Sequence, residues 1–188
     1  MTTPRPSLFE SGYFAAAWVV AGMALAGVPA LSVALHENHH EDLWIYTSGS
    51  AIGWSGQSPY DTDRIRERVS QQFPPDAAAE HNILVENCGY FLAPQAVLVF
   101  APAIPWPWMT AKVLWCIASI GLGALAGWML LPAFGVSNVP YWLRGVSAFV
   151  VLSNPMTLFA LVIGQTSVFF FSCVVLGQSL YRANWKVT

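Results

Sequence analysis

The residues best suited to chemistry are concentrated in one polar segment, residues 36–88. This segment holds nine of the ten acidic residues and all four histidines. Near its start, Asp42, Tyr46, Gly49 and Gly53 are four, three and four residues apart, which places them on one face if the segment is helical. A carboxylate beside a phenol and two positions without side chains would leave room for a ligand. Asp42 is therefore the first candidate for a functional residue.

The histidines at the start of the same segment allow a second interpretation. His36, His39 and His40 have helical spacing, and with Asp42 they could bind a transition metal. His-rich junctions next to a membrane are more often solvated clusters, so we predict no metal site. Asp42 itself has a simpler alternative role as a helix cap or a surface acid.

The arginines further along the segment lie on a second predicted helix, residues 61–73. Arg64, Arg66 and Arg68 alternate along the chain, so on a helix they spread around the surface instead of forming one patch. A solvated face is the favoured interpretation of these residues, and a phosphate clamp is the alternative.

The rest of the chain is apolar and must position this polar segment. Charged residues make up 10% of the 188 residues, against about 25% in an average soluble domain. Residues 11–35 carry no charge, and residues 87–181 carry only Lys112 and Arg144. These stretches exclude a water-soluble enzyme, and a net charge of −2 excludes a surface that binds nucleic acid. The sequence predicts an all-α integral membrane protein.

Helices of about 20 apolar residues are long enough to cross a bilayer. Residues 13–35 meet this length and are interpreted as a retained first helix. Residues 90–104 form a short second candidate that contains two prolines, and residues 109–131 form a third.

The last apolar stretch, residues 141–181, is long enough for two further helices. Its turn fits either Ser153–Pro155 or Gly164–Gln165. We therefore predict about five transmembrane helices, four of them in a helical membrane domain of residues 89–181.

The basic residues do not settle the orientation by number alone. With both chain ends placed inside, four basic residues lie on each side. Three of the outer four lie deep in the long polar segment, where the positive-inside rule is weak. We therefore expect residues 36–88 to form an external loop with amphipathic helices, and residues 1–12 and 182–188 to be short cytoplasmic tails. The inner residues are Arg5, Lys112, Arg182 and Lys186, and the outer ones are Arg64, Arg66, Arg68 and Arg144.

Five short motifs, in order over residues 42–165, resemble the amino-terminal half of glycosyltransferase family 87. This family has the GT-C architecture, uses polyprenol-phosphate sugars and includes α-mannosyltransferases. Its members are commonly about twice as long, so the resemblance implies a partial GT-C fold here. The motifs are Asp42-x3-Tyr46-x2-Gly49 with Gly56-Gln57-Ser58-Pro59-Tyr60, Tyr90-Phe91-x2-Pro94, Pro102-x2-Pro105 with Ala111-x2-Leu114-Trp115, Asn154-Pro155, and Gly164-Gln165.

The resemblance implies transfer of a hexose, often mannose, from a polyprenyl phosphate to an acceptor hydroxyl. The reaction would take place at the external face of the plasma (inner) membrane, on a carbohydrate or glycolipid acceptor. Asp42 matches the general base. No cofactor or metal is implied, and a partner chain could supply the missing half. The matching substrate-binding residues are Tyr46, Gly49, Tyr60, Asn154 and Gln165.

Other interpretations stay open at this point. Asn154 and Gln165 could instead form hydrogen bonds between helices. The chain could be a non-catalytic membrane remnant or a partner subunit. It could also be a small transporter or a metal-handling protein that uses the cluster from His36 to Asp42.

Overall fold

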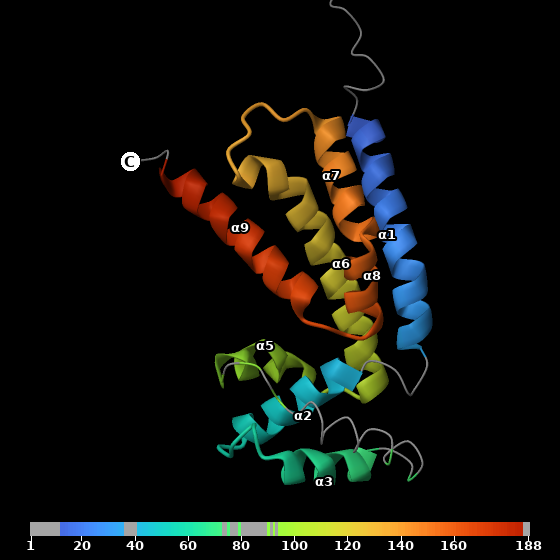
Figure 1. Cartoon of the computed structure of the whole chain (residues 1–188), viewed down its shortest axis with the longest axis vertical. Coiled ribbons are helices and arrows are strands. Elements are labelled where there is room, and N and C mark those ends of the chain that lie inside the picture. The colour runs from blue at the N-terminus through green and yellow to red at the C-terminus, as the bar shows by residue number, and fades with distance from the viewer. Residues whose placement is uncertain are drawn as a thin grey trace, which may run out of the picture. The chain divides into compact units, whose positions relative to one another are not determined.

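The computed structural model describes residues 12–35, 41–72, 75, 79, 90, 92 and 94–185. All the regular secondary structure in these residues is helical (Figure 1). The chain divides into two compact units. The loop unit comprises residues 33–114, and the bundle unit comprises residues 1–32 and 115–188.

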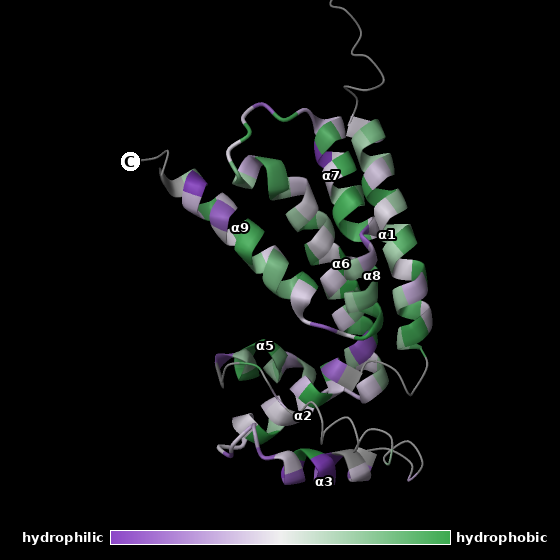
Figure 2. Cartoon of the chain, viewed as in Figure 1, coloured by the Kyte–Doolittle hydropathy of each residue, from purple (hydrophilic) through white to green (hydrophobic). Residues whose placement is uncertain are grey.

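The bundle unit consists mainly of apolar helices (Figure 2). Two helices are long and apolar enough to cross a membrane, α1 (Gly12–Ala34) and α6 (Trp108–Ala133), and α6 starts in the loop unit. These helices confirm the predicted first and third apolar helices to within two residues. The other helices of the unit are α7 (Tyr141–Ser153), α8 (Pro155–Val162) and α9 (Ser167–Trp185).

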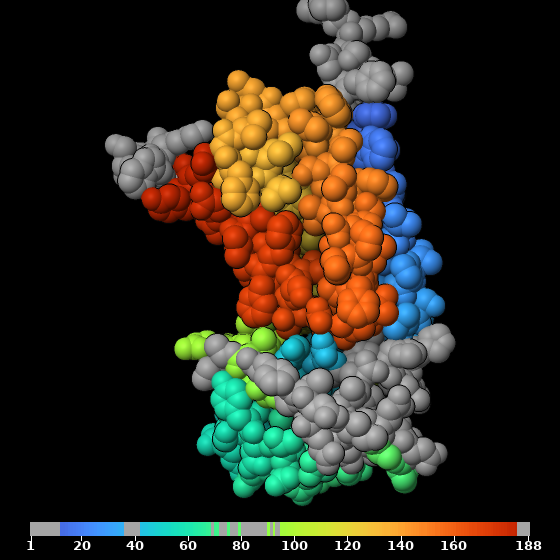
Figure 3. Space-filling model, viewed as in Figure 1, coloured from blue at the N-terminus to red at the C-terminus, as the bar shows by residue number. Residues whose placement is uncertain are grey.

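Helices α7 and α8 are bent by 55° and together count as at most one further span. The described residues thus contain two or three candidate spans, and the predicted number of five is not confirmed. In the space-filling view α9 lies against α8 (Figure 3).

Both predicted turns in residues 141–181 exist, so this stretch forms three helices instead of two. Asn154 is extended, with ψ 130°, and its side chain accepts a hydrogen bond from the backbone N–H of Met156 at 2.9 Å. Pro155 follows as the first residue of α8, where its missing N–H costs nothing. Gly164 then ends α8 with φ 74°, a value that favours glycine.

Small residues let the helices of the bundle unit approach closely. A Cβ added at Gly145 of α7 would lie 2.5 Å from the backbone oxygen of Ala15 in α1. A Cβ added at Gly127 of α6 would lie 2.5 Å from the Cα of Ala148 in α7. These contacts are backbone against backbone, which is how small residues hold helices together where no hydrophobic driving force exists.

The loop unit contains α2 (Glu41–Trp54) and α3 (Thr62–Gln72), which confirm the two helices predicted in the polar segment. Its core is formed by the buried side chains Trp44, Ile45, Ile52, Ile65 and Tyr90. The described part of the polar segment therefore has its own apolar core, and the loop unit extends beyond residue 88 to residue 114.

The stretch predicted as the second span, residues 90–104, does not form a membrane-length helix. It contains the short segments η2 (Pro94–Ala96), α5 (Val97–Phe100) and η3 (Ala101–Ala103). A ten-residue helix would extend only about 15 Å, half the thickness of the hydrocarbon core. Prolines at positions 94 and 102 remove backbone donors, and α5 and η3 pack on α2 instead.

We expect Gly145→Ala to destabilise the bundle unit by about 1–3 kcal/mol, because its new methyl group would overlap the backbone of α1. Gly121→Ala in α6 is the matched control, since a Cβ there meets nothing within 4 Å. Unfolding of the purified variants in detergent measures both effects. Equal stability of the two variants would show that α1 and α7 are not in close contact.

Candidate functional site

The predicted base, Asp42, lies in the first turn of α2 and is half-buried. The helix α1 ends at Ala34, so only a short connection separates a membrane-length helix from this carboxylate. An acid in the first turn is also favoured by the helix dipole, which is the structural alternative for this residue.

The predicted metal ligands His36, His39 and His40 lie outside the described residues. Among the residues that are described, no group of three or more His, Cys, Asp or Glu side chains is arranged to hold a metal ion.

The face of α2 that carries Asp42 is covered by other parts of the loop unit. Gly49 contacts the ring of Tyr90, and a Cβ there would also lie 3.1 Å from the backbone oxygen of Pro59. A Cβ at Gly53 would lie 2.9 Å from Cγ2 of Val97 in α5. The expected room for a ligand at these two glycines is therefore filled by protein side chains, because the chain returns onto this face of α2 after residue 89.

Three tyrosines surround the contact at Gly49. The Tyr90 ring centroid lies 6.0 Å from that of Tyr46 and 5.5 Å from that of Tyr60. The Tyr60 hydroxyl donates a hydrogen bond to the backbone oxygen of Leu92 at 2.8 Å. The structure thus brings together the predicted residues Tyr46, Gly49 and Tyr60, and it adds Tyr90, which the sequence analysis named only as part of a motif.

The environment of Tyr90 shifts the pKa of its phenol. Burial raises the pKa of its phenol, the Ser50 hydroxyl at 3.5 Å lowers it, and the nearby Tyr60 raises it further. The net effect is a pKa above the ordinary value of about 10. Tyr90 therefore stays neutral and serves as a packing group at physiological pH.

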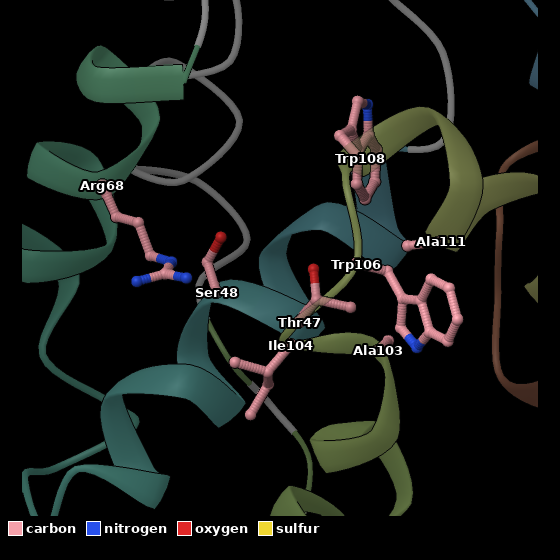
Figure 4. A pocket seen from close by; sticks show the side chains of 8 residues that line it. All are labelled: Thr47, Ser48, Arg68, Ala103, Ile104, Trp106, Trp108 and Ala111. Atoms are coloured by element: carbon pink, nitrogen blue, oxygen red, sulfur yellow. The ribbon is translucent and has the colours of Figure 1, made fainter.

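A small cavity lies on another face of α2, lined by Thr47 and Ser48 from α2, Arg68 from α3, and Trp106 and Trp108 (Figure 4). Ser48 is only 2% exposed, and its hydroxyl has no hydrogen-bond partner among the described residues. The Thr47 hydroxyl donates to the backbone oxygen of Trp44 at 3.1 Å. In Figure 4 the Arg68 guanidinium points toward Ser48.

Arg68 differs from the two arginines that precede it on α3. Arg64 pairs with Asp61 at 3.1 Å, and Arg66 pairs with Asp63 at 3.0 Å. Arg68 makes no ion pair within the described parts of the chain. The sequence held a signal for this difference, because an acid stands three residues before each of the paired arginines, whereas Ile65 stands three residues before Arg68.

Lys112 is a further cation of the loop unit, and the sequence analysis did not name it as a site residue. Lys112 is fully buried near the start of α6, and its ammonium lies 5.6 Å from the centroid of the Trp108 ring. A buried lysine on an aromatic face is stabilised by a cation–π interaction. The same Trp108 also lines the cavity.

The cavity has the chemistry and the size of a small oxyanion site. The cavity has a volume of about 40 Å³. One water-sized group needs roughly 10–15 Å³ of such a volume, so the cavity holds about three of them. A guanidinium offers several N–H donors to a phosphate or carboxylate, and the Ser48 hydroxyl can donate one more. Asp42 is not among the lining residues, and at 100° per residue its face lies about 120° from that of Ser48.

The predicted residues Asn154 and Gln165 belong to the bundle unit, where both stabilise breaks between helices. Asn154 caps α8 as described above. Gln165 donates its backbone N–H to the oxygen of Ala160 at 2.8 Å, and its side-chain oxygen accepts from the Ser167 hydroxyl at 3.1 Å. Asn154 and Ser167 also line an apolar cavity of about 380 Å³.

Comparison with known proteins gives no match, because no family model fits the chain and neither a curated protein nor a solved structure is significantly similar to it. The resemblance to glycosyltransferase family 87 therefore rests on the motifs alone.

The raised pKa of Tyr90 predicts a pH-dependent stability. The unfolded chain releases this proton near pH 10, whereas the folded chain retains it to higher pH. The stabilisation is complete below about pH 10 and is lost as the pH rises through the raised value. Tyr90→Phe cannot ionise, so its unfolding midpoint should fall less between pH 8 and 11 than that of the parent protein.

Tyr13→Phe is the control for this comparison, because Tyr13 is 89% exposed. The same pH dependence in the parent protein and in Tyr90→Phe would contradict the assignment.

Proposed function

We propose that the chain is a membrane glycosyltransferase that transfers a hexosyl group, with mannose as the first candidate, from a polyprenyl-phosphate sugar to an acceptor hydroxyl. Asp42 is the general base in this proposal. The observation that carries it is the position of Asp42, half-buried in the first turn of α2 and shortly after a membrane-length helix.

This position suits the physical demands of the reaction. The lipid tail of the donor stays in the bilayer while its sugar reaches water, so the reacting atoms meet at the membrane surface. The acceptor hydroxyl must lose a proton as it attacks the anomeric carbon, and a carboxylate within hydrogen-bond reach can accept that proton. Phosphate is already a competent leaving group, so a catalytic acid is not required.

The cavity at Arg68 supplies a second argument for a phosphate-bearing substrate. A guanidinium without an ion-pair partner in the described residues can offset the charge that develops on a departing phosphate. Arg64 and Arg66, each paired with an acid, are less suited to this role.

The arrangement of the bundle unit supports an inside amino terminus. A cavity between α1 and α6 is lined by Gly12 and Trp128, so the start of α1 lies beside the end of α6. Arg144 near the start of α7 is then on the same side as the amino terminus, and not on the opposite side as in the five-span prediction.

Arg182 lies against Gly135, so it is on this side too. With Arg5 and Lys186 placed by their sequence positions, four basic residues are inside. Outside the polar segment only Lys112 faces the other way. This asymmetry follows the positive-inside rule and leaves the loop unit external.

A non-catalytic membrane protein, such as a partner subunit, is the second candidate function. It is favoured by the side chains that fill the space at Gly49 and Gly53, and by the separation of Asp42 from the cavity. A subunit would keep this folded loop unit without using Asp42 as a base.

Asp42→Asn tests the two functions against each other. It keeps the size of the side chain but removes its proton-accepting charge, and general base catalysis is worth about 10²- to 10⁴-fold, or roughly 3–5 kcal/mol of barrier. Sugar transfer in membranes that retain any partner chain should fall by this factor, in kcat more than in donor affinity.

Asp63→Asn is the matched control, because its exposed ion pair with Arg66 contributes little. If Asp42→Asn retains more than a third of the parent turnover, the general-base role is lost, and the subunit becomes the better explanation.

The orientation predicts different labelling of two exposed serines. In a background without Cys88, Cys116 and Cys173, an impermeant thiol reagent added outside should label Ser55→Cys in the loop unit. Ser137→Cys, in the connection after α6, should react only after the membrane is permeabilised. Labelling of both from outside would mean that residues 90–104 do cross the membrane, as in the five-span prediction.

A further inference from the structure

We propose that Arg144 and Arg182 of the bundle unit form a binding site for a phosphate group, and that its natural source is the headgroup of an anionic membrane lipid. This site is separate from Asp42 and the cavity at Arg68. It does not depend on whether the chain transfers a sugar.

The two arginines line one open cavity of about 340 Å³. The cavity lies where the end of α6, the connection to α7 and the last turns of α9 meet. Its polar lining also includes Ser137, Asn138 and Ser179. A phosphate group with its first ester substituents fits in this volume, whereas the cavity at Arg68 holds only about three water-sized groups.

Local contacts hold both guanidinium groups at the cavity. A Cβ added at Gly135 would lie 2.5 Å from one terminal nitrogen of Arg182 and 3.0 Å from its Cζ, so this guanidinium rests directly on the α6–α7 connection. Glycine suits position 135 for two reasons. A Cβ there would overlap the Arg182 guanidinium, and the φ of 97° favours a residue without a side chain.

Arg144 is held by contacts with residues near the start of α7. Its Nε donates to the backbone oxygen of Val139 at 3.3 Å, and its guanidinium carbon lies 5.9 Å from the centroid of the Tyr141 ring. A guanidinium has five N–H donors, so four remain after this bond. The side chain is thereby oriented while most of its donors stay available to a ligand.

No carboxylate of the described bundle unit can neutralise these two charges. Residues 12–32 and 115–185 contain no Asp or Glu. Two arginines in one cavity with no acid among its described lining residues attract a group that carries negative charge and several acceptor oxygens. Phosphate meets both requirements, and arginine binds it through two parallel hydrogen bonds.

The aromatic residues at this end of the bundle favour a lipid as the source. Tyr13, Tyr141 and Tyr181 are exposed at 89%, 60% and 59%, and Trp142 is also exposed. Tyrosine and tryptophan gather at the depth of the lipid headgroups. Basic pockets between helices at that depth bind anionic headgroups.

Native mass spectrometry of the detergent-purified full chain, titrated with phosphatidylglycerol, tests this site. Arg144→Gln/Arg182→Gln should weaken binding of the first lipid by about tenfold or more, because the charge-assisted hydrogen bonds to its phosphate are lost. Arg64→Gln in the loop unit is the control for loss of a positive charge. Helix content from circular dichroism confirms that each variant is folded.

A second arm identifies the source of the phosphate. Phosphatidylcholine, whose headgroup has no net charge, should bind the parent protein and the double variant equally. If millimolar inorganic phosphate binds by itself and displaces phosphatidylglycerol, the site is a phosphate site with a soluble ligand. Equal binding of phosphatidylglycerol to the parent protein, the double variant and Arg64→Gln would overturn the proposal.

Discussion

The contact between the Tyr90 ring and Gly49 is the constraint on which the loop unit depends. It joins two points of the chain that are 41 residues apart in sequence, and no side chain other than hydrogen fits at position 49. Tyr46 and Tyr60 pack around the same ring, and α5 follows onto α2 through Val97 and Gly53. A polar segment thereby acquires an apolar core without needing a bilayer.

This contact also decides what the next apolar stretch does. Residues 94–103 begin four residues after Tyr90. They are short and interrupted by prolines, and α5 and η3 within them pack on α2. One span fewer before α6 would put Arg144 on the side of the amino terminus, as in the proposed orientation. The proposed site at Arg144 and Arg182 does not depend on this orientation, because both arginines line one cavity of the bundle unit.

The sequence predicted the elements whose signals are local. Length and apolar composition were sufficient for α1 and α6, and both breaks in residues 141–181 have their own local cause in Asn154–Pro155 and Gly164. The occupant of the space at Gly49 could not be predicted, because it depends on a contact across 41 residues. The hydropathy of residues 90–104 could not decide between a span and a core segment for a related reason, since apolar residues suit a protein core and a bilayer equally well.

The separation of Asp42 from the cavity at Arg68 limits how the two can cooperate. Six residues along α2 correspond to about 9 Å of rise, and the two faces differ by about 120°. A general base must lie within about 3 Å of the acceptor oxygen, and Asp42 is not among the residues that line the cavity at Arg68. In a transferase, a phosphate bound by Arg68 would have to be part of the sugar donor, which connects this phosphate to the reacting carbon. Arg68 would then contribute to donor affinity more than to the proton transfer, so its contribution is separable from that of Asp42.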